Sequence, residues 1–201
     1  MRIQFLFDFG SPNAYLAHTQ IADIESRTGA SVEYVPVLLG GVFKATGNKS
    51  PAETFAHVPA KRAYDQRDMQ RHIDRMDVPY TRNPFFPVNT LQIMRGAVAR
   101  MDSADFMPYV DAVYRAMWVE GKKMDEADVI ASVLEAEGLD TERFAAQIQD
   151  HGVKARLISL TDDAVARGVF GSPSFFVDDE QFFGKDRLDW FEAAIVSAKA
   201  S

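Results

Sequence analysis

The chain has 201 residues, of which 47% are hydrophobic and 25% charged, and its formal net charge is −7 at pH 7. These proportions are ordinary for a globular protein, and the length suits one compact domain or two small ones. The acidic balance argues against nucleic acid or an anionic membrane surface as a partner, because both need a basic face. The absence of cysteine excludes disulfides, thiolate zinc sites and redox chemistry by a dithiol of the protein itself.

No apolar run approaches the roughly 20 residues that a membrane-spanning helix needs. The apolar opening of the chain stops at Asp8, which is too short for the core of a signal peptide. We therefore expect a cytoplasmic protein with no membrane partner.

The first 40 residues alternate between strand and helix patterns. Ile3 to Phe9 is almost wholly apolar, which is typical of a strand covered on both faces. Pro12 suits the first turn of a helix, and apolar residues then recur at helical spacing as far as Gly29. Val32 to Leu39 is rich in β-branched residues and predicts a second strand. A strand, a helix and a strand within this length indicate a right-handed βαβ unit.

The middle of the chain, from Gly40 to about Thr161, shows no convincing strand pattern. Pro79 to Pro87 is a loop, and Phe43 to Asn48 is a loop or a short helix. Ser103 is the expected N-cap of its helix. The apolar spacing predicts five helices, over Pro59–Asp77, Asn89–Met101, Ser103–Glu120, Asp125–Glu137 and Asp140–Gln149.

Alternation returns at the end of the chain. A helix ends near Arg167, strands are predicted over Pro173–Val177 and Gln181–Phe183, and Lys185–Ala198 is a closing helix. These elements complete the opening βαβ unit. The expected fold is therefore α/β and thioredoxin-like, with residues 1–40 and 160–201 forming one domain and residues 41–159 forming a large all-helical insertion.

Two short motifs at opposite ends of the chain resemble the two sides of a thioredoxin-fold active site. Gly10-Ser11-Pro12 joins the first strand to the first helix, and Ser11 stands where a redox thioredoxin has its leading cysteine. Gly171-Ser172-Pro173 precedes a strand, where thioredoxin-like folds have a cis proline. The site keeps the place for a thiol, but the chain has no thiol of its own. We therefore expect the site to bind the thiol of another molecule, and glutathione is the expected source.

Ser11 is the expected catalytic residue. A thiolate at a helix N-terminus has a lowered pKa, because unpaired backbone N–H groups and the helix dipole favour negative charge. Ser11 would donate its hydroxyl to that thiolate without attacking anything itself. Ser172 would offer its backbone to the cysteinyl part of glutathione. The alternatives are that Ser11 is only an N-cap and that Pro173 only starts a strand.

Asp186 lies in the first turn of the closing helix. Its carboxylate would bind the amino group of the γ-glutamyl end of glutathione, while backbone N–H groups there would bind the carboxylate; alternatively it only complements the helix dipole. Loop residues of the insertion are candidates for substrate binding, namely Lys44, Asn48, Asn83, Phe86 and Asn89. The four histidines are scattered without ligand spacing, so no metal site is expected.

The residues also resemble a known family, the 2-hydroxychromene-2-carboxylate isomerases, which are related to kappa-class glutathione transferases within the DsbA-like group. The resemblance spans nearly the whole chain and is carried by motifs in the same order: Phe7-Asp8-Phe9-Gly10-Ser11-Pro12-x-x-Tyr15-Leu16, Gly40-Gly41-Val42-Phe43-Lys44-Ala45-Thr46-Gly47-Asn48, Lys61-x-x-Tyr64-x-x-x-Asp68-x-x-Arg71, Phe86-Pro87-x-Asn89-Thr90, Val169-Phe170-Gly171-Ser172-Pro173 and Phe183-Gly184-Lys185-Asp186-Arg187-Leu188.

The resemblance implies a glutathione-dependent isomerase of aromatic catabolism that converts 2-hydroxychromene-2-carboxylate, or a close analogue, to trans-o-hydroxybenzylidenepyruvate. It also implies a homodimer, and a glutathione site at positions Ser11, Pro12, Val169, Ser172, Pro173, Lys185 and Asp186. Some family members have a lysine at the position of Phe43 and an Asn–Arg pair at Glu53-Thr54, which leaves the exact substrate open. The alternatives are a kappa-like glutathione transferase and a non-catalytic thioredoxin-like binding module.

Overall fold

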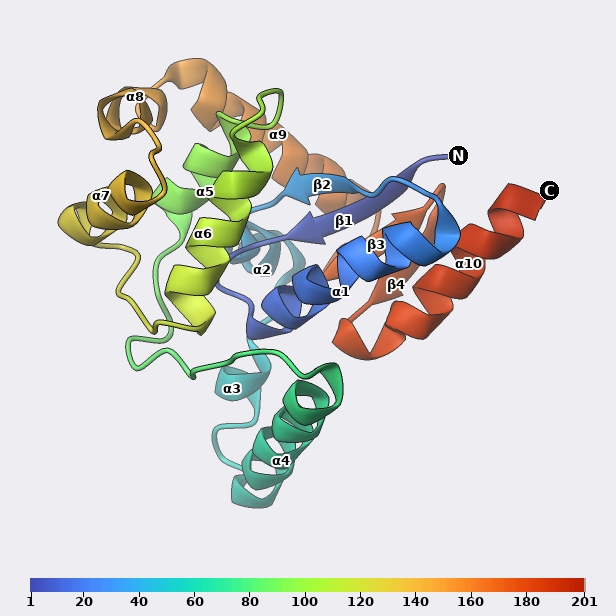
Figure 1. Ribbon diagram of the computed structural model, residues 1–201. Helices are drawn as coiled ribbons and strands as arrows, with labels where there is room; N and C mark the ends of the chain where they lie inside the picture. Colours follow the sequence, from blue (N-terminus) through green and yellow to red (C-terminus); the bar gives the residue numbers. More distant parts are fainter. Residues whose placement is uncertain (201) are drawn as a thin grey trace.

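The centre of the fold is a four-stranded mixed sheet with the order β2-β1-β3-β4 (Figure 1). In the computed structural model, which describes residues 1–200, the strands are β1 Ile3–Phe7, β2 Glu33–Pro36, β3 Ser174–Val177 and β4 Glu180–Phe183. β1 pairs parallel with β2 and antiparallel with β3, which pairs antiparallel with β4. The two central strands come from opposite ends of the chain, as the thioredoxin-like prediction requires.

Helices cover both faces of this sheet (Figure 1). On one face α1, Pro12–Thr28, and α10, Leu188–Ala200, pack with the rings of Phe5 and Phe175 in the main core. On the other face α2, Leu39–Thr46, and α9, His151–Ala166, pack against the sheet in a second, smaller apolar cluster. All five residues of β1 are buried because both of its faces are covered, which explains why four of the five are apolar.

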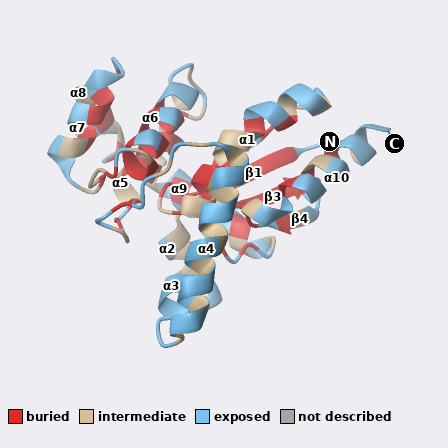
Figure 2. Cartoon of the chain, turned by 60° about the horizontal axis from the view of Figure 1, so that its bottom comes forward, coloured by how far each residue is buried: buried red, intermediate tan, exposed pale blue. Residues whose placement is uncertain are grey.

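The region between α2 and α9, all of which the structure describes, consists of helices and loops and contains no strand, as predicted. Its helices are α3 Pro51–Thr54, α4 Pro59–Met76, α5 Leu91–Val98, α6 Phe106–Trp118, α7 Ala127–Ala136 and α8 Thr141–Gln147. α6 carries the largest buried side chains, and their rings join the main core. In contrast, none of the residues of α4, all of which the structure describes, is buried, and α3 and α4 project from the body (Figure 2).

Several element boundaries differ from the sequence prediction. The second strand ends at Pro36 and α2 begins at Leu39, so the stretch expected as strand up to Leu39 is too long. Of the two alternatives predicted for Phe43 to Asn48, the short helix is confirmed as far as Thr46, where α2 ends. Ser103 is not an N-cap, because its hydroxyl donates to the Arg100 carbonyl and α6 begins only at Phe106. The closing helix begins as a 3-10 turn, η1, Lys185–Arg187.

At the residue 160 boundary expected between the two domains, α9 continues without a break.

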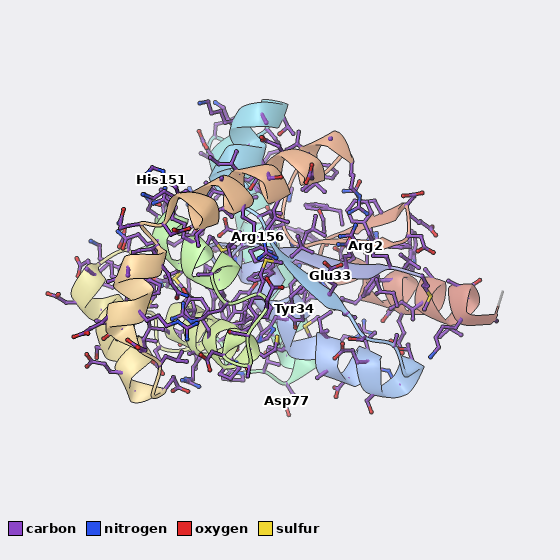
Figure 3. All side chains as sticks on the ribbon, turned by 90° about the horizontal axis from the view of Figure 1, so that it is seen from above. Arg2, Glu33, Tyr34, Asp77, His151 and Arg156 are labelled. Atoms are coloured by element: carbon purple, nitrogen blue, oxygen red, sulfur yellow. The ribbon has the colours of Figure 1, made fainter. Side chains whose placement is uncertain are left out.

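Polar side chains form hydrogen bonds at the end of the sheet next to α9. Glu33 accepts from Arg2 at 3.1 Å (Figure 3). Glu33 also accepts from Gln4 at 2.9 Å, and Arg167 of the turn after α9 donates to Gln4 at 2.7 Å. Among residues 1–200, no helix is both long and apolar enough to span a bilayer.

Candidate thiol site

Ser11 lies between β1 and α1 and is only 4% exposed. It is the N-cap of α1, since its Oγ accepts a hydrogen bond from the backbone N–H of Ala14 at 3.2 Å. Its hydroxyl also donates to the carbonyl oxygen of Ser172 at 2.7 Å. Ser11 is therefore a helix cap and, at the same time, a contact between the two motifs that the sequence singled out.

The Ser172–Pro173 peptide bond is cis, as predicted. The loop that contains it is held from three directions. Ser172 Oγ accepts from the backbone N–H of Asp8 at 3.1 Å, Ser174 Oγ donates to the Gly171 carbonyl at 2.9 Å, and the N–H of Gly184 donates to the Pro173 carbonyl at 3.1 Å. The start of η1 is thereby fixed against the same loop. A second cis bond, Phe86–Pro87, lies in the insertion.

Gly184 directly precedes η1 and has a backbone conformation that favours glycine. Its φ of 98° lies in a region that favours glycine, and an added Cβ would lie 2.5 Å from Asp186 Oδ1. The Asp186 carboxylate is half-exposed and accepts a hydrogen bond from Arg187 at 2.7 Å. Asp186 is thus available to a ligand, but an arginine already competes for it.

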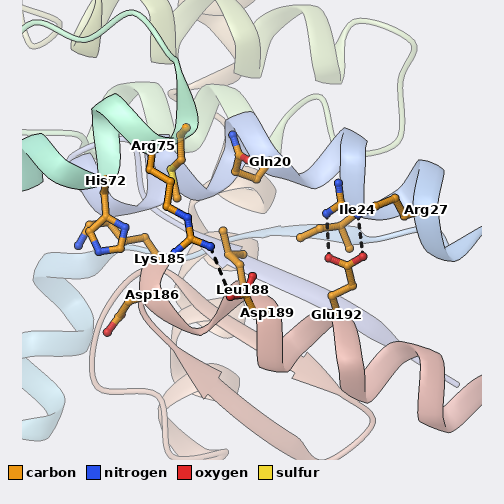
Figure 4. A pocket seen from close by; sticks show the side chains of 11 residues that line it. Gln20, Ile24, Arg27, His72, Arg75, Lys185, Asp186, Leu188, Asp189 and Glu192 are labelled. Atoms are coloured by element: carbon orange, nitrogen blue, oxygen red, sulfur yellow. Dashed lines mark hydrogen bonds and ion pairs between the residues drawn. The ribbon is translucent and has the colours of Figure 1, made fainter.

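Lys185 lines a pocket of about 140 Å³ between α1, α4 and the start of α10 (Figure 4). Its side chain is only 12% exposed, and its Nζ lies 4.0 Å from Asp68 Oδ2 on α4. Burial lowers the pKa of Lys185 from its usual value of 10.5, although nearby carboxylates oppose the shift. Burial and the charge of Lys185 also lower the pKa of His72, which lines the same pocket. A carboxylate ligand would stabilise the charge on Lys185.

Pro12 and Val169 are the two remaining positions predicted to bind glutathione, and they lie in different surroundings. Pro12 is the first residue of α1, directly after Ser11. Val169 is fully buried, its side chain belongs to the smaller apolar cluster, and its N–H donates to the Ala164 carbonyl at 3.0 Å. The side chain of Val169 therefore packs in the core, and a ligand would meet only its backbone.

The predicted substrate residues occupy two different environments. Lys44 and Asn48 are exposed near the end of α2, and the Asn48 amide donates to the Phe170 carbonyl at 2.8 Å, beside the cis-proline loop. Asn89 is exposed before α5 and accepts from the N–H of Leu91 at 3.0 Å. Asn48 therefore lies beside the cis-proline loop of the thiol site.

Asn83 and Phe86 hold the insertion together instead. Asn83 is 2% exposed, and its amide donates to the carbonyls of Met117 and Lys122 while its oxygen accepts from the N–H of Phe85. The ring of Phe86 is 5.9 Å from that of Trp118, which is itself buried. The polar atoms of Asn83 are fully used inside the protein, and they are not directed at a ligand in this arrangement.

Asp8 is a residue of the site that was not among the site residues predicted from the sequence. It is 1% exposed at the end of β1 and accepts backbone hydrogen bonds from Gly10 at 2.8 Å and from Leu39 at 2.7 Å. Burial raises the pKa of the Asp8 carboxyl above its usual value of 3.8, and the hydrogen bonds oppose that shift. The signal was present in the sequence, because Asp8 is the one charged residue in the largely apolar segment from Ile3 to Phe9. Within the described part of the chain, no group of three or more acidic or histidine side chains is arranged to hold a metal ion.

Comparison with known proteins agrees with this geometry. The family model of the DSBA-like thioredoxin domain matches residues 2–196. The 2-hydroxychromene-2-carboxylate isomerase of Sphingobium xenophagum is 30% identical over 194 residues, covering 96% of this chain and 97% of that protein. Glutathione S-transferase kappa 1 of Caenorhabditis elegans is 27% identical over 201 residues, covering 93% of this chain and 87% of that protein.

A solved structure of a 2-hydroxychromene-2-carboxylate isomerase superposes with a TM-score of 0.85 at 30% identity, and each chain covers 100% of the other. Fold, motif order and sequence identity over nearly the full length therefore agree. The chain belongs to the DsbA-like thioredoxin-domain family and, within it, to the 2-hydroxychromene-2-carboxylate isomerases.

Proposed function

We propose that the protein is a glutathione-dependent isomerase that converts 2-hydroxychromene-2-carboxylate, or a close analogue, to trans-o-hydroxybenzylidenepyruvate. The observation that carries the proposal is the contact of Ser11 with Ser172 at 2.7 Å in a chain that has no cysteine. A helix N-terminus, a serine hydroxyl and the backbone beside a cis proline are assembled there. The thiol that such a site handles must come from another molecule.

The residues present fit glutathione. The N-terminus of α1 and the Ser11 hydroxyl would face the sulfur, because both stabilise negative charge. The backbone of Ser172 would pair with the cysteinyl residue, as an added strand pairs with a sheet edge. Lys185, a largely buried cation, would lie near a carboxylate of the tripeptide, and Asp186 near its amino group.

Glutathione supplies a thiolate whose reversible addition to a double bond conjugated with a carbonyl makes that bond single, so that it rotates before elimination restores it. The protein's task is to hold the sulfur ionised and the substrate close to it. Ser11 performs the first part of this task by donating a hydrogen bond. Lys44 and Asn48, exposed near the end of α2, are the side chains we propose for the substrate carboxylate.

The test compares reduced glutathione with S-methylglutathione. We expect both to bind, and only reduced glutathione to support isomerisation. Free glutathione measured before and after complete turnover should be unchanged, since an isomerase returns all of it. Full turnover in thiol-free buffer would contradict the proposal.

A kappa-like glutathione transferase is the second candidate, favoured by the full-length similarity to glutathione S-transferase kappa 1. It would use the same thiolate on an electrophile that cannot release it again. The consumption of glutathione distinguishes the transferase from the isomerase, because a transferase consumes one glutathione per product. Binding of glutathione without turnover of either kind of substrate would indicate a non-catalytic binding module.

We also propose that the enzyme works as a homodimer in the cytoplasm. The reducing cytoplasm holds the thiol that the site needs, and the cysteine-free chain has no disulfide to maintain there. Light scattering of the purified protein across a concentration series measures its mass in solution. A mass of about 22.5 kDa at every concentration would contradict the dimer.

A further inference from the structure

The carboxyl group of Asp8 connects three separate segments of the chain. Its Oδ1 accepts from the N–H of Gly10 at 2.8 Å, and its Oδ2 accepts from the N–H of Leu39 at 2.7 Å. The Thr90 side chain lies beside the same carboxyl group, where its hydroxyl lowers the pKa of Asp8. Asp8 is 1% exposed, so protein donors stabilise the group in place of water.

Each of the three residues around the carboxyl group stands at or next to the start of a turn or helix near the thiol site. Gly10 directly precedes Ser11, and Leu39 is the first residue of α2, the helix that leads to Lys44 and Asn48. Thr90 occupies the cap position of α5, at the end of the loop that follows α4. Asp8 therefore connects the thiol site with the start of α2 and with the start of α5 inside the helical insertion.

The packing around the carboxyl group is tight. A Cβ added to Gly10 would lie 3.1 Å from Thr90 Cγ2 and 3.3 Å from Asp8 Oδ1. The backbone of Asp8 adds two more connections, since its N–H donates to Ser172 Oγ at 3.1 Å and its carbonyl accepts from the N–H of Ser11 at 3.0 Å. A shift of Asp8 would thus move both sides of the thiol site.

We propose that Asp8 is a positioning residue of the isomerase: its carboxyl group sets the position of the Ser11 turn relative to the segments that begin at Leu39 and Thr90. The inference rests on the proposed function, because it concerns the alignment of thiolate and substrate. Asp8 acts through Gly10, Leu39 and Thr90 and touches neither reactant. Misplacement of reacting groups by about 1 Å lowers rates by on the order of a hundredfold.

The test uses two variants and a matched control. Asp8→Asn keeps the size of the side chain, but its NH₂ group would face one of the N–H donors. Thr90→Val removes the hydroxyl donor and keeps the side-chain shape. The control is Thr161→Val, since Thr161 Oγ1 accepts from the N–H of Leu38 at 3.0 Å, one residue before Leu39, without contact to the Ser11 turn.

For Asp8→Asn we expect kcat to fall by about ten- to a hundredfold and the pKa of the bound glutathione thiol to rise. For Thr90→Val we expect a smaller fall of kcat. Thr161→Val should lower the melting temperature and leave kcat and the thiol pKa at wild-type values. All rates are measured well below the melting temperature, so that lost stability alone does not change them.

Folded Asp8→Asn protein with wild-type kcat and a wild-type thiol pKa would overturn the proposal. If Asp8→Asn does not fold, the comparison of Thr90→Val with Thr161→Val decides, and equal kcat values overturn it. A wild-type enzyme that isomerises without glutathione refutes the proposed function itself, and the positioning role falls with it. A glutathione-dependent wild type with an unaffected Asp8→Asn variant refutes only the role of Asp8.

Discussion

The hydroxyl of Ser11 and the carbonyl of Ser172 are hydrogen-bonded to each other at 2.7 Å, so each is occupied before any ligand arrives. An incoming thiolate would take the hydroxyl from Ser172. The released carbonyl would then accept the cysteinyl N–H of glutathione. In the proposed complex, glutathione binding would therefore be an exchange of hydrogen-bond partners, which avoids leaving a buried polar group unsatisfied.

Ser11→Ala should raise the pKa of the bound glutathione thiol and lower the rate of isomerisation. The thiolate loses a hydrogen-bond donor, whereas the helix N-terminus remains. Loss of the N-cap should cost about 0.5–2 kcal/mol of stability, so the variant should still fold. The ultraviolet absorbance of the thiolate, followed against pH in the complex, measures the shift.

The matched control for Ser11→Ala is Ser174→Ala. Ser174 is also buried and donates to the Gly171 carbonyl at 2.9 Å in the same cis-proline loop. We expect a comparable loss of stability with little change in the thiol pKa. If both variants leave the titration and the rate unchanged, Ser11 is only a helix cap.

Lys185→Gln should remove part of the pH dependence of ligand binding. Burial lowers the pKa of Lys185 below 10.5, and pairing with a ligand carboxylate would raise it again. Binding then takes up a proton between the lowered pKa and about 10.5, so affinity is highest below this window and falls as the pH rises through it. The dissociation constant of S-methylglutathione, which has no thiol to titrate, is measured against pH for both proteins. Parallel curves would show that Lys185 does not meet the ligand.

Gly96→Ala should destabilise the protein although alanine favours helices. Gly96 lies inside α5, and an added Cβ would collide with the hydroxyl of Tyr109, which is itself bonded to the Ile93 carbonyl. Overpacking typically costs 1–3 kcal/mol, more than the roughly 1 kcal/mol that alanine contributes to a helix. The melting temperature should fall by several degrees, since 1 kcal/mol shifts a protein of this size by about 2–4 °C.

Gly40→Ala is the control for Gly96→Ala, because Gly40 is also helical and an added Cβ would have nothing within 4 Å. Its melting temperature should stay the same or rise slightly. A Gly96→Ala variant as stable as Gly40→Ala would show that α5 and α6 can move apart without cost.

Local chemistry explains what the sequence predicted. The apolar run of β1, the proline after Ser11 and the motif before Pro173 each carry their information within a few residues, and the structure confirms the strand, the helix start and the cis bond. The contact of Ser11 with Ser172 follows from placing both motifs on one thioredoxin-like sheet. The fold was thus predictable wherever neighbours in sequence determine the conformation.

Long-range contacts explain what the sequence missed. Asp8, Leu39 and Thr90 are far apart in the sequence, so nothing local indicates that one carboxyl group joins them. Asn83 has the composition of a ligand-binding loop residue, yet its amide is used by two carbonyls more than 30 positions away. The residues that contact the substrate, the domain boundaries and the dimer stay predictions.

Asp186→Asn should weaken glutathione binding and leave saturated turnover almost unchanged. A charge-assisted pair with the γ-glutamyl amine contributes roughly 1.5–3 kcal/mol, which corresponds to a loss of about ten- to a hundredfold in affinity. Arg187 already pairs with Asp186 at 2.7 Å and competes with the amine, so the lower end of the range is expected. The dissociation constant is measured on folded protein beside Asp189→Asn, an exposed carboxylate in the first turn of α10. Equal constants for wild type and Asp186→Asn would mean that Asp186 serves only the helix dipole, since a small loss of melting temperature is expected in either case.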